Sequence, residues 1–134
     1  MSLNAAIVAR ATTHAGLSAL IAGRIYDRRA PQNATRPYVT FEMVGGAGRV
    51  RSMSNGVDLF AQRVQFTVIA NTVTDELSVH DQLIAAFDWL HGPHGSTAIE
   101  LAQTDGGRQS LDSIQVLPDA RESSQDFIFH YRVA

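Results

Sequence analysis

Residues 25–44 read IYDRRAPQNATRPYVTFEMV, and this stretch links the first helical part of the chain to its first long strand. Two of the four prolines, Pro31 and Pro37, lie here, and each biases the residue before it towards an extended backbone. From Tyr38 to Val44, β-branched and aromatic side chains predict a strand. The stretch therefore predicts an ordered connector that leads directly into a sheet.

Apolar residues at helical spacing lie on both sides of this stretch. Residues 3–22 have that spacing with a break near Gly16, which predicts a helix in two parts. Gly23 lies where a glycine commonly follows the end of a helix. Downstream, residues 74–90 predict a second main helix, with Thr74 as its N-cap.

The remaining segments read as strands. Alternating apolar and polar residues predict strands at 59–70 and 127–133, and a hairpin is predicted between 98–103 and 109–117. The order of helix, strands, helix and strands is typical of an α+β fold. We expect one domain over residues 1–134, with a single mostly antiparallel β-sheet and two main helices packed on one face.

The composition excludes several kinds of site. The 134 residues are 45% hydrophobic and 18% charged, a balance typical of one globular domain. There is no cysteine, which excludes disulfides and thiolate metal sites, and no lysine, which excludes Schiff-base chemistry. The net charge of −2 lacks the basic excess of a nucleic-acid-binding protein. No signal peptide or transmembrane span is expected.

Catalytic and metal-binding motifs are not evident. His91 and His94 lie close in sequence, but no third ligand is placed near them by its spacing. The glycines of residues 45–49 loosely resemble a phosphate-binding loop, but a turn and a strand follow them instead of a helix. We therefore expect no enzyme activity, no metal and no cofactor.

Two arginine-containing segments are candidate interfaces. The glycine-rich segment 45–58 predicts a loop or a mobile hairpin, which either orders on a neighbouring protein or stays disordered. On the first reading, its contact residues are Arg49, Val50, Arg51 and Met53. Around the connector, Arg24, Arg28, Arg29 and Arg36 cluster in sequence; they bind phosphate or a carboxylate of a partner, with Arg28 and Arg29 as the candidate interface residues, or they face solvent, partly neutralised by Asp27.

A family resemblance accompanies the connector. The run Gly23-Arg24-Ile25-Tyr26-Asp27, followed by Ala30-Pro31-Gln32 and by Pro37-Tyr38-Val39, resembles the tail-completion family of long-tailed bacteriophages and prophages. The later elements follow in the same order, so the resemblance covers nearly the whole chain. Its specific part is structural and not catalytic.

The resemblance implies a structural virion protein with a fold similar to phage tail terminators. Such subunits assemble as a ring, commonly of six, that ends the tail tube and joins the tail to the head. The implied partners are further copies of the chain, the tail-tube protein and head-connector proteins, without sequence-specific DNA contact or a membrane. It also implies synthesis in the bacterial cytoplasm. The alternative is a small dimeric α+β ligand-binding or enzyme module, which has a similar element order.

Overall fold

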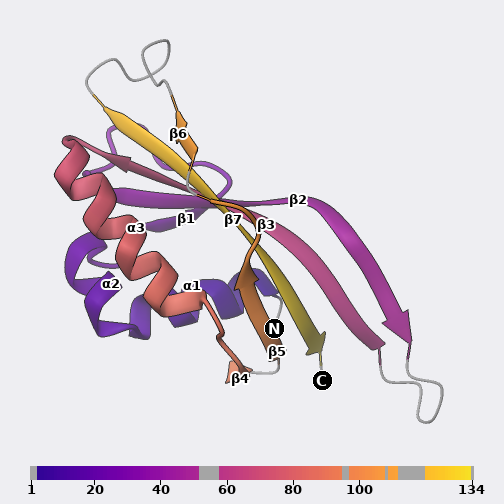
Figure 1. Ribbon diagram of the computed structural model, residues 1–134. Helices are drawn as coiled ribbons and strands as arrows, with labels where there is room; N and C mark the ends of the chain where they lie inside the picture. Colours follow the sequence, from indigo (N-terminus) through magenta and orange to yellow (C-terminus); the bar gives the residue numbers. More distant parts are fainter. Residues whose placement is uncertain (1–2, 52–57, 95–96, 108, 112–119, 134) are drawn as a thin grey trace.

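A computed structural model describes residues 3–51, 58–94, 97–107, 109–111 and 120–133 (Figure 1). In this part of the chain there are three helices: α1 (Leu3–Thr13), α2 (Ala15–Ile21) and α3 (Val73–Phe87). The strands are β1 (Ile25–Asp27), β2 (Tyr38–Arg51), β3 (Asp58–Ala70), β4 (Gly92–His94), β5 (Thr97–Thr104), β6 (Gln109–Leu111) and β7 (Arg121–Val133). The predicted α+β class is confirmed.

All the strands belong to one sheet. Its order is β1-β2-β3-β7-β5-β4, and β6 pairs separately with β7. The short β1 is parallel to β2, with Tyr26 opposite Thr40, whereas every other pairing is antiparallel. The sheet is thus mixed. β1 and β2 are parallel because the connector returns the chain to the end of the sheet at which β1 starts, and β2 begins there.

The predicted hairpin between residues 98–103 and 109–117 is wrong in its pairing. Among the described residues, β5 and β6 both pair with β7 and not with each other, and residues 112–117 of the predicted strand lie outside the described part of the chain. The last strand is also longer than predicted, because it begins at Arg121. Its first part pairs with β6, and its last part pairs with β5. The polar residues at its start do not interrupt it; three of them are buried: Ser123, Ser124 and Gln125.

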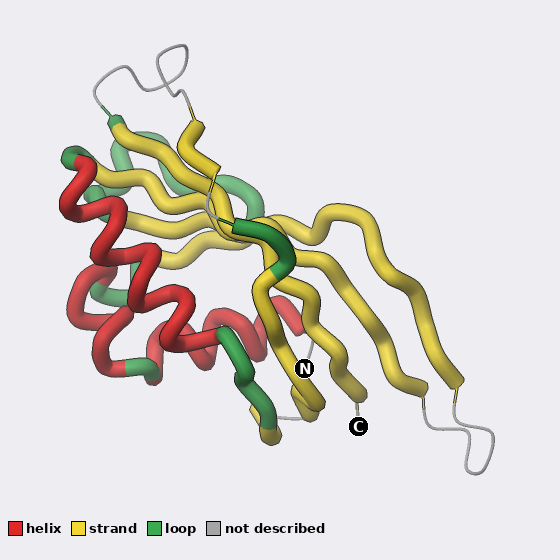
Figure 2. The backbone as a smooth tube through the Cα atoms, in the orientation of Figure 1, coloured by secondary structure: helices red, strands yellow, loops and turns green. Residues whose placement is uncertain are grey.

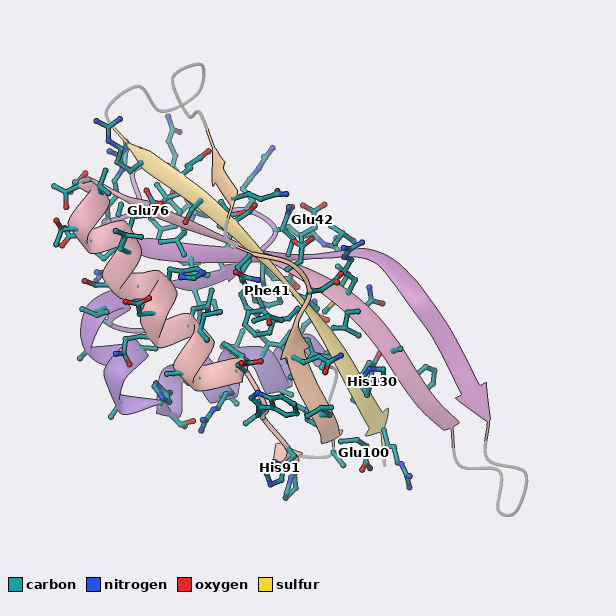
Figure 3. The ribbon with its side chains drawn as sticks, viewed as in Figure 1. Phe41, Glu42, Glu76, His91, Glu100 and His130 are labelled. Carbon is teal, nitrogen blue, oxygen red and sulfur yellow. The ribbon has the colours of Figure 1, made fainter. Side chains whose placement is uncertain are left out.

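One face of the sheet forms the core together with the helices. Figure 1 shows the helices gathered on one side of the sheet, and Figure 3 shows Phe41 on that side of β2 with Glu42 on the other. Side chains from α1, α2 and α3 join one buried cluster with residues of β2, β3, β5 and β7. The largest fully buried side chains of this cluster are five phenylalanines: Phe41, Phe66, Phe87, Phe127 and Phe129.

The helix ends differ from the prediction by a few residues. The first helical segment breaks at His14, two residues before Gly16, because the imidazole of His14 caps a new helix. The second main helix is capped by Thr72 and not by Thr74: the Thr72 hydroxyl accepts from the backbone N–H of Asp75 at 3.1 Å. Gly23, at φ +78°, follows α2 as predicted.

The His14 cap makes a pH-dependent contribution to stability. Its Nδ1 accepts from the backbone N–H of Leu17 at 3.2 Å, which requires a neutral ring. Burial, reinforced by the charge of Arg10, lowers the pKa of His14 below its usual 6.5. Because the unfolded state then binds more protons below that value, the free energy of unfolding decreases as pH falls through 6.5 towards the folded-state pKa.

We expect His14→Ser to retain the cap but flatten this pH dependence between about pH 7 and 5. His14→Ala should cost about 1 kcal/mol at neutral pH, because it removes the cap. Urea unfolding at the two pH values tests both. Identical pH profiles for the wild type and His14→Ser would show that another group carries the dependence.

Candidate assembly surfaces

The connector between β1 and β2 forms a second, small core on the face of the sheet opposite the helices. Tyr38 and Ile69 are neighbours across β2 and β3, and both are buried with Ala120. Tyr26, Ala30 and Ala34 pack against them, and the Tyr26 ring meets Tyr38 edge-on at 5.9 Å. The connector is therefore packed onto the sheet and is not a free loop.

Backbone hydrogen bonds fix the path of the connector. The N–H of Arg28 donates to the carbonyl of Phe41 at 2.7 Å, at the end of β1. The guanidinium of Arg24 donates to the carbonyl of Pro37 at 3.0 Å, so it ties the two ends of the connector together. Arg28 and Asn33 have left-handed backbones, with φ of 69° and 65°. These bonds hold the connector residues between Arg28 and Pro37 above a cavity on the sheet.

This cavity, here called the connector pocket, has a volume of about 520 Å³. It is lined by the connector and by Tyr38 and Thr40. Three of its lining residues are arginines: Arg28, Arg29 and Arg36. The Nε of Arg28 lies 3.8 Å from Asp27, and Arg36 donates to the neutral side chain of Asn71 at 3.2 Å. Within the described part of the chain, neither Arg29 nor Arg36 is paired with a carboxylate. The pocket therefore has excess positive charge.

Burial shifts the pKa values of two groups beside the pocket, Tyr38 and Glu122. Burial raises the pKa of Tyr38, the charge of Arg36 opposes that shift, and Glu122 adds to it. Burial also raises the pKa of Glu122. In both groups burial disfavours the charged form, as expected for side chains that pack beneath the connector.

The distal hairpin is the second candidate surface. Residues 45–51, predicted as part of a loop or mobile hairpin, continue β2, and β3 begins at Asp58. Register shifts occur between Met43 and Gly46 and again before Gly48, and Figure 1 shows β2 bending there. Gly45 adopts φ +50°, which suits glycine, and its carbonyl accepts from Gln62 at 3.1 Å.

Beyond this bend the hairpin extends past the helices (Figure 2). It also has an open edge. The pairing of β1 with β2 ends at Phe41, so within the described residues no strand lies along the outer edge of β2 beyond that point. A projecting hairpin with an open edge is accessible to a neighbouring protein.

The predicted interface residues lie on both surfaces but not together. Arg28 and Arg29 line the connector pocket. Residues 49–51 end β2, and Met53 lies outside the described residues. Asp27 pairs with Phe41, and Arg49 follows Phe41 by eight positions along β2, so about 26 Å of strand separates the two groups.

Sequence analysis missed the ion pairs on the open face of the sheet. Arg63 of β3 forms an ion pair with Asp105, and its Nε lies 3.5 Å from Asp126 of β7. Further along, Arg132 and Glu100 pair at 3.0 Å. Strand alternation places Arg63 and Asp126 on outward faces, but the strand order was needed to bring them together.

Metal-binding clusters and membrane spans are absent from the described residues. Among them, no three histidine or acidic side chains gather so that they could hold a metal ion. No described helix has both the length and the apolar character needed to cross a membrane.

Comparison with known proteins identifies the family. The profile of the family described as tail completion protein gp17 matches residues 5–89, more than half of the chain, including both helical segments and the connector. The chain belongs to this tail completion family. The predicted resemblance is confirmed, and the protein is a structural component of the tail of a phage-like virion. None of the curated protein sequences matches it significantly.

Solved structures with the same fold extend over nearly the whole chain of this tail completion protein. One is a chain of the virion of a native gene transfer agent particle, with a TM-score of 0.72 and 13% identity over 98% of this chain and 95% of that one. A second has a TM-score of 0.52 and 16% identity over 100% of this chain and 96% of the other. At these identities the likeness establishes the fold alone, including the part beyond residue 89.

Proposed function

We propose that this tail completion protein forms a closed ring on the end of the tail tube, stops its growth, and provides the surface to which the head is joined. Its partners are further copies of itself, in a ring of about six, together with the tail-tube and head-connector proteins. It is made in the bacterial cytoplasm and enters the virion without sequence-specific DNA contact.

The family membership carries this proposal. Two further features support it. The chain resembles a chain of a gene transfer agent virion over almost its full length. It also has two surfaces suited to protein contacts, the connector pocket and the projecting hairpin, on one small domain. We assign Arg28 and Arg29 to the first contact surface, and Arg49, Val50, Arg51 and Met53 to the second.

The mass of the assembled species tests the ring. We expect size-exclusion chromatography with light scattering to show a closed species of about six subunits at high concentration, visible as a ring in negative stain. If only monomers are found, polymerised tail-tube protein should capture them at its ends. A stable dimer that retains a small ligand, and that tubes do not capture, would instead favour the binding-module alternative.

A further inference from the structure

We propose that the arginine pocket of one subunit receives the exposed flank of α3 from a second copy of the chain. This inference rests on the proposed ring and identifies one pair of surfaces within it. The receiving surface is the pocket lined by Arg28, Arg29 and Arg36, and the inserted surface is the stripe formed by Val73, Leu77 and Asp81.

The pocket offers unpaired positive charge beside apolar walls. The side chain of Arg28 is 76% exposed, and its contact with Asp27 at 3.8 Å is a loose one. Asp27 is also engaged elsewhere, since it accepts a hydrogen bond from Asn4 at 2.6 Å. Ala30, Pro31 and Ala34 provide the apolar part of the lining, and the remaining lining residues are Gln32, Asn33, Tyr38 and Thr40. A matching partner carries carboxylates next to apolar side chains.

The α3 stripe has this composition. Val73 and Leu77 are two of the three large hydrophobic side chains that are exposed among the described residues, at 51% and 41%. Asp81 follows one turn later with a side chain 79% exposed, so the three lie along one line of the helix at a spacing of four residues. The Asp81 carboxylate lies 3.8 Å from the Nδ1 of His80, and α3 contains no arginine or lysine. The pocket would complement these exposed apolar side chains and the exposed carboxylate beside them.

The positions of the two surfaces meet one requirement of ring symmetry, a shared position along the sheet. Rotation about a ring axis changes neither the height of a surface nor its distance from the axis, so surfaces that meet head-to-tail must share both. The connector packs on the face of the sheet opposite the helices, whereas α3 packs on the other. Both lie at the same end of the sheet, because Tyr38 is opposite Ile69 and Arg36 donates to Asn71, two residues before α3.

Crosslinking tests this pairing, and the absence of native cysteine makes the chain suitable for it. Gln32→Cys places a thiol on the exposed connector, and Thr74→Cys places one on the exposed start of α3. We expect a short bis-maleimide to give about tenfold more dimer from a mixture of the two single variants than from either alone. As a control, Gln109→Cys, at an exposed residue of β6, takes the place of either variant in the mixture. This mixture should give no more dimer than the single variants alone.

Charge reversal provides an independent measure. We expect Arg28→Glu with Arg29→Glu in the Gln32→Cys chain, or Asp81→Arg in the Thr74→Cys chain, to reduce the mixed dimer about tenfold, the equivalent of 1.4 kcal/mol. Mixing the two charge-reversed chains with each other should restore the amount of mixed dimer. Glu100→Arg makes the same change of charge in the middle of β5, where it breaks the pair with Arg132, and should leave the amount of mixed dimer unchanged.

The outcomes separate this pairing from the ring itself. A mixture that yields no more crosslinked dimer than the single variants would overturn the pairing, as would charge reversals without effect. If rings form in negative stain without this crosslink, the ring stands and the pairing is wrong. If the crosslink forms and no closed species appears in solution or on tubes, the pairing stands and the ring proposal fails.

Discussion

Replacing Phe66 with alanine should lower the free energy of unfolding by about 3–5 kcal/mol, a large part of the total stability of a domain this size. Phe66 is fully buried in β3 and contacts the other four buried phenylalanines, so truncation leaves a cavity that its neighbours fill only partly. Its ring centroid lies 6.0 Å from Phe41, 5.0 Å from Phe87, 5.4 Å from Phe127 and 6.4 Å from Phe129.

Urea unfolding of the monomer measures this effect, and thermal unfolding should show a decrease in Tm of roughly 10–20 °C. Leu77→Ala is the control, because the same kind of truncation at a side chain 41% exposed should change stability by only about 0.5 kcal/mol. A loss below about 1 kcal/mol for Phe66→Ala would mean that the aromatic cluster is not the centre of the core.

The second large effect concerns assembly. We expect Arg49→Ala combined with Arg51→Ala to reduce the yield of infectious particles by more than about tenfold, because arginine is enriched among the interface residues whose loss costs about 2 kcal/mol or more. Both residues lie in the part of β2 beyond its bend, where the hairpin extends past the helices. The measurement is complementation of a particle that lacks this gene, with titres compared between variant and wild type.

Folding and assembly must be distinguished in that experiment. The isolated double variant should unfold within about 2 °C of the wild type, because both positions lie in β2 beyond its bend, away from the buried core of the described residues. Arg121→Ala combined with Arg132→Ala removes the same charge from two exposed positions of β7 and should leave the titre unchanged. Wild-type titres from Arg49→Ala/Arg51→Ala would show that the hairpin arginines are not an interface.

Local sequence patterns were sufficient where the signal itself is local. The alternation in β3 and the apolar spacing in α3 identified both elements, since each depends on which residues face the core. The break in the first helical segment was also predicted near its true position. The two helix starts were placed a few residues away because several residues nearby could act as caps.

Long-range pairing could not be predicted in the same way. Nothing local to β5 or β6 indicates that both pair with β7, because that pairing depends on the length of β7 and on buried polar residues at its start. Likewise, glycines suggested a loop at residues 45–51, whereas they accommodate bulges in a continuing strand. The connector arginines were recognised, but not the pocket, which needs the sheet beneath it.

The irregularity of β2 has a further consequence for a subunit proposed to end the growth of a tube. A straight, open strand edge presents backbone donors and acceptors at a regular repeat, which is a template for open-ended stacking into fibrils. In β2 the register shifts around Gly46 disturb that repeat along the part of the edge that β1 leaves uncovered. We therefore expect the bend that carries the hairpin outwards to disfavour regular edge-to-edge stacking of free subunits.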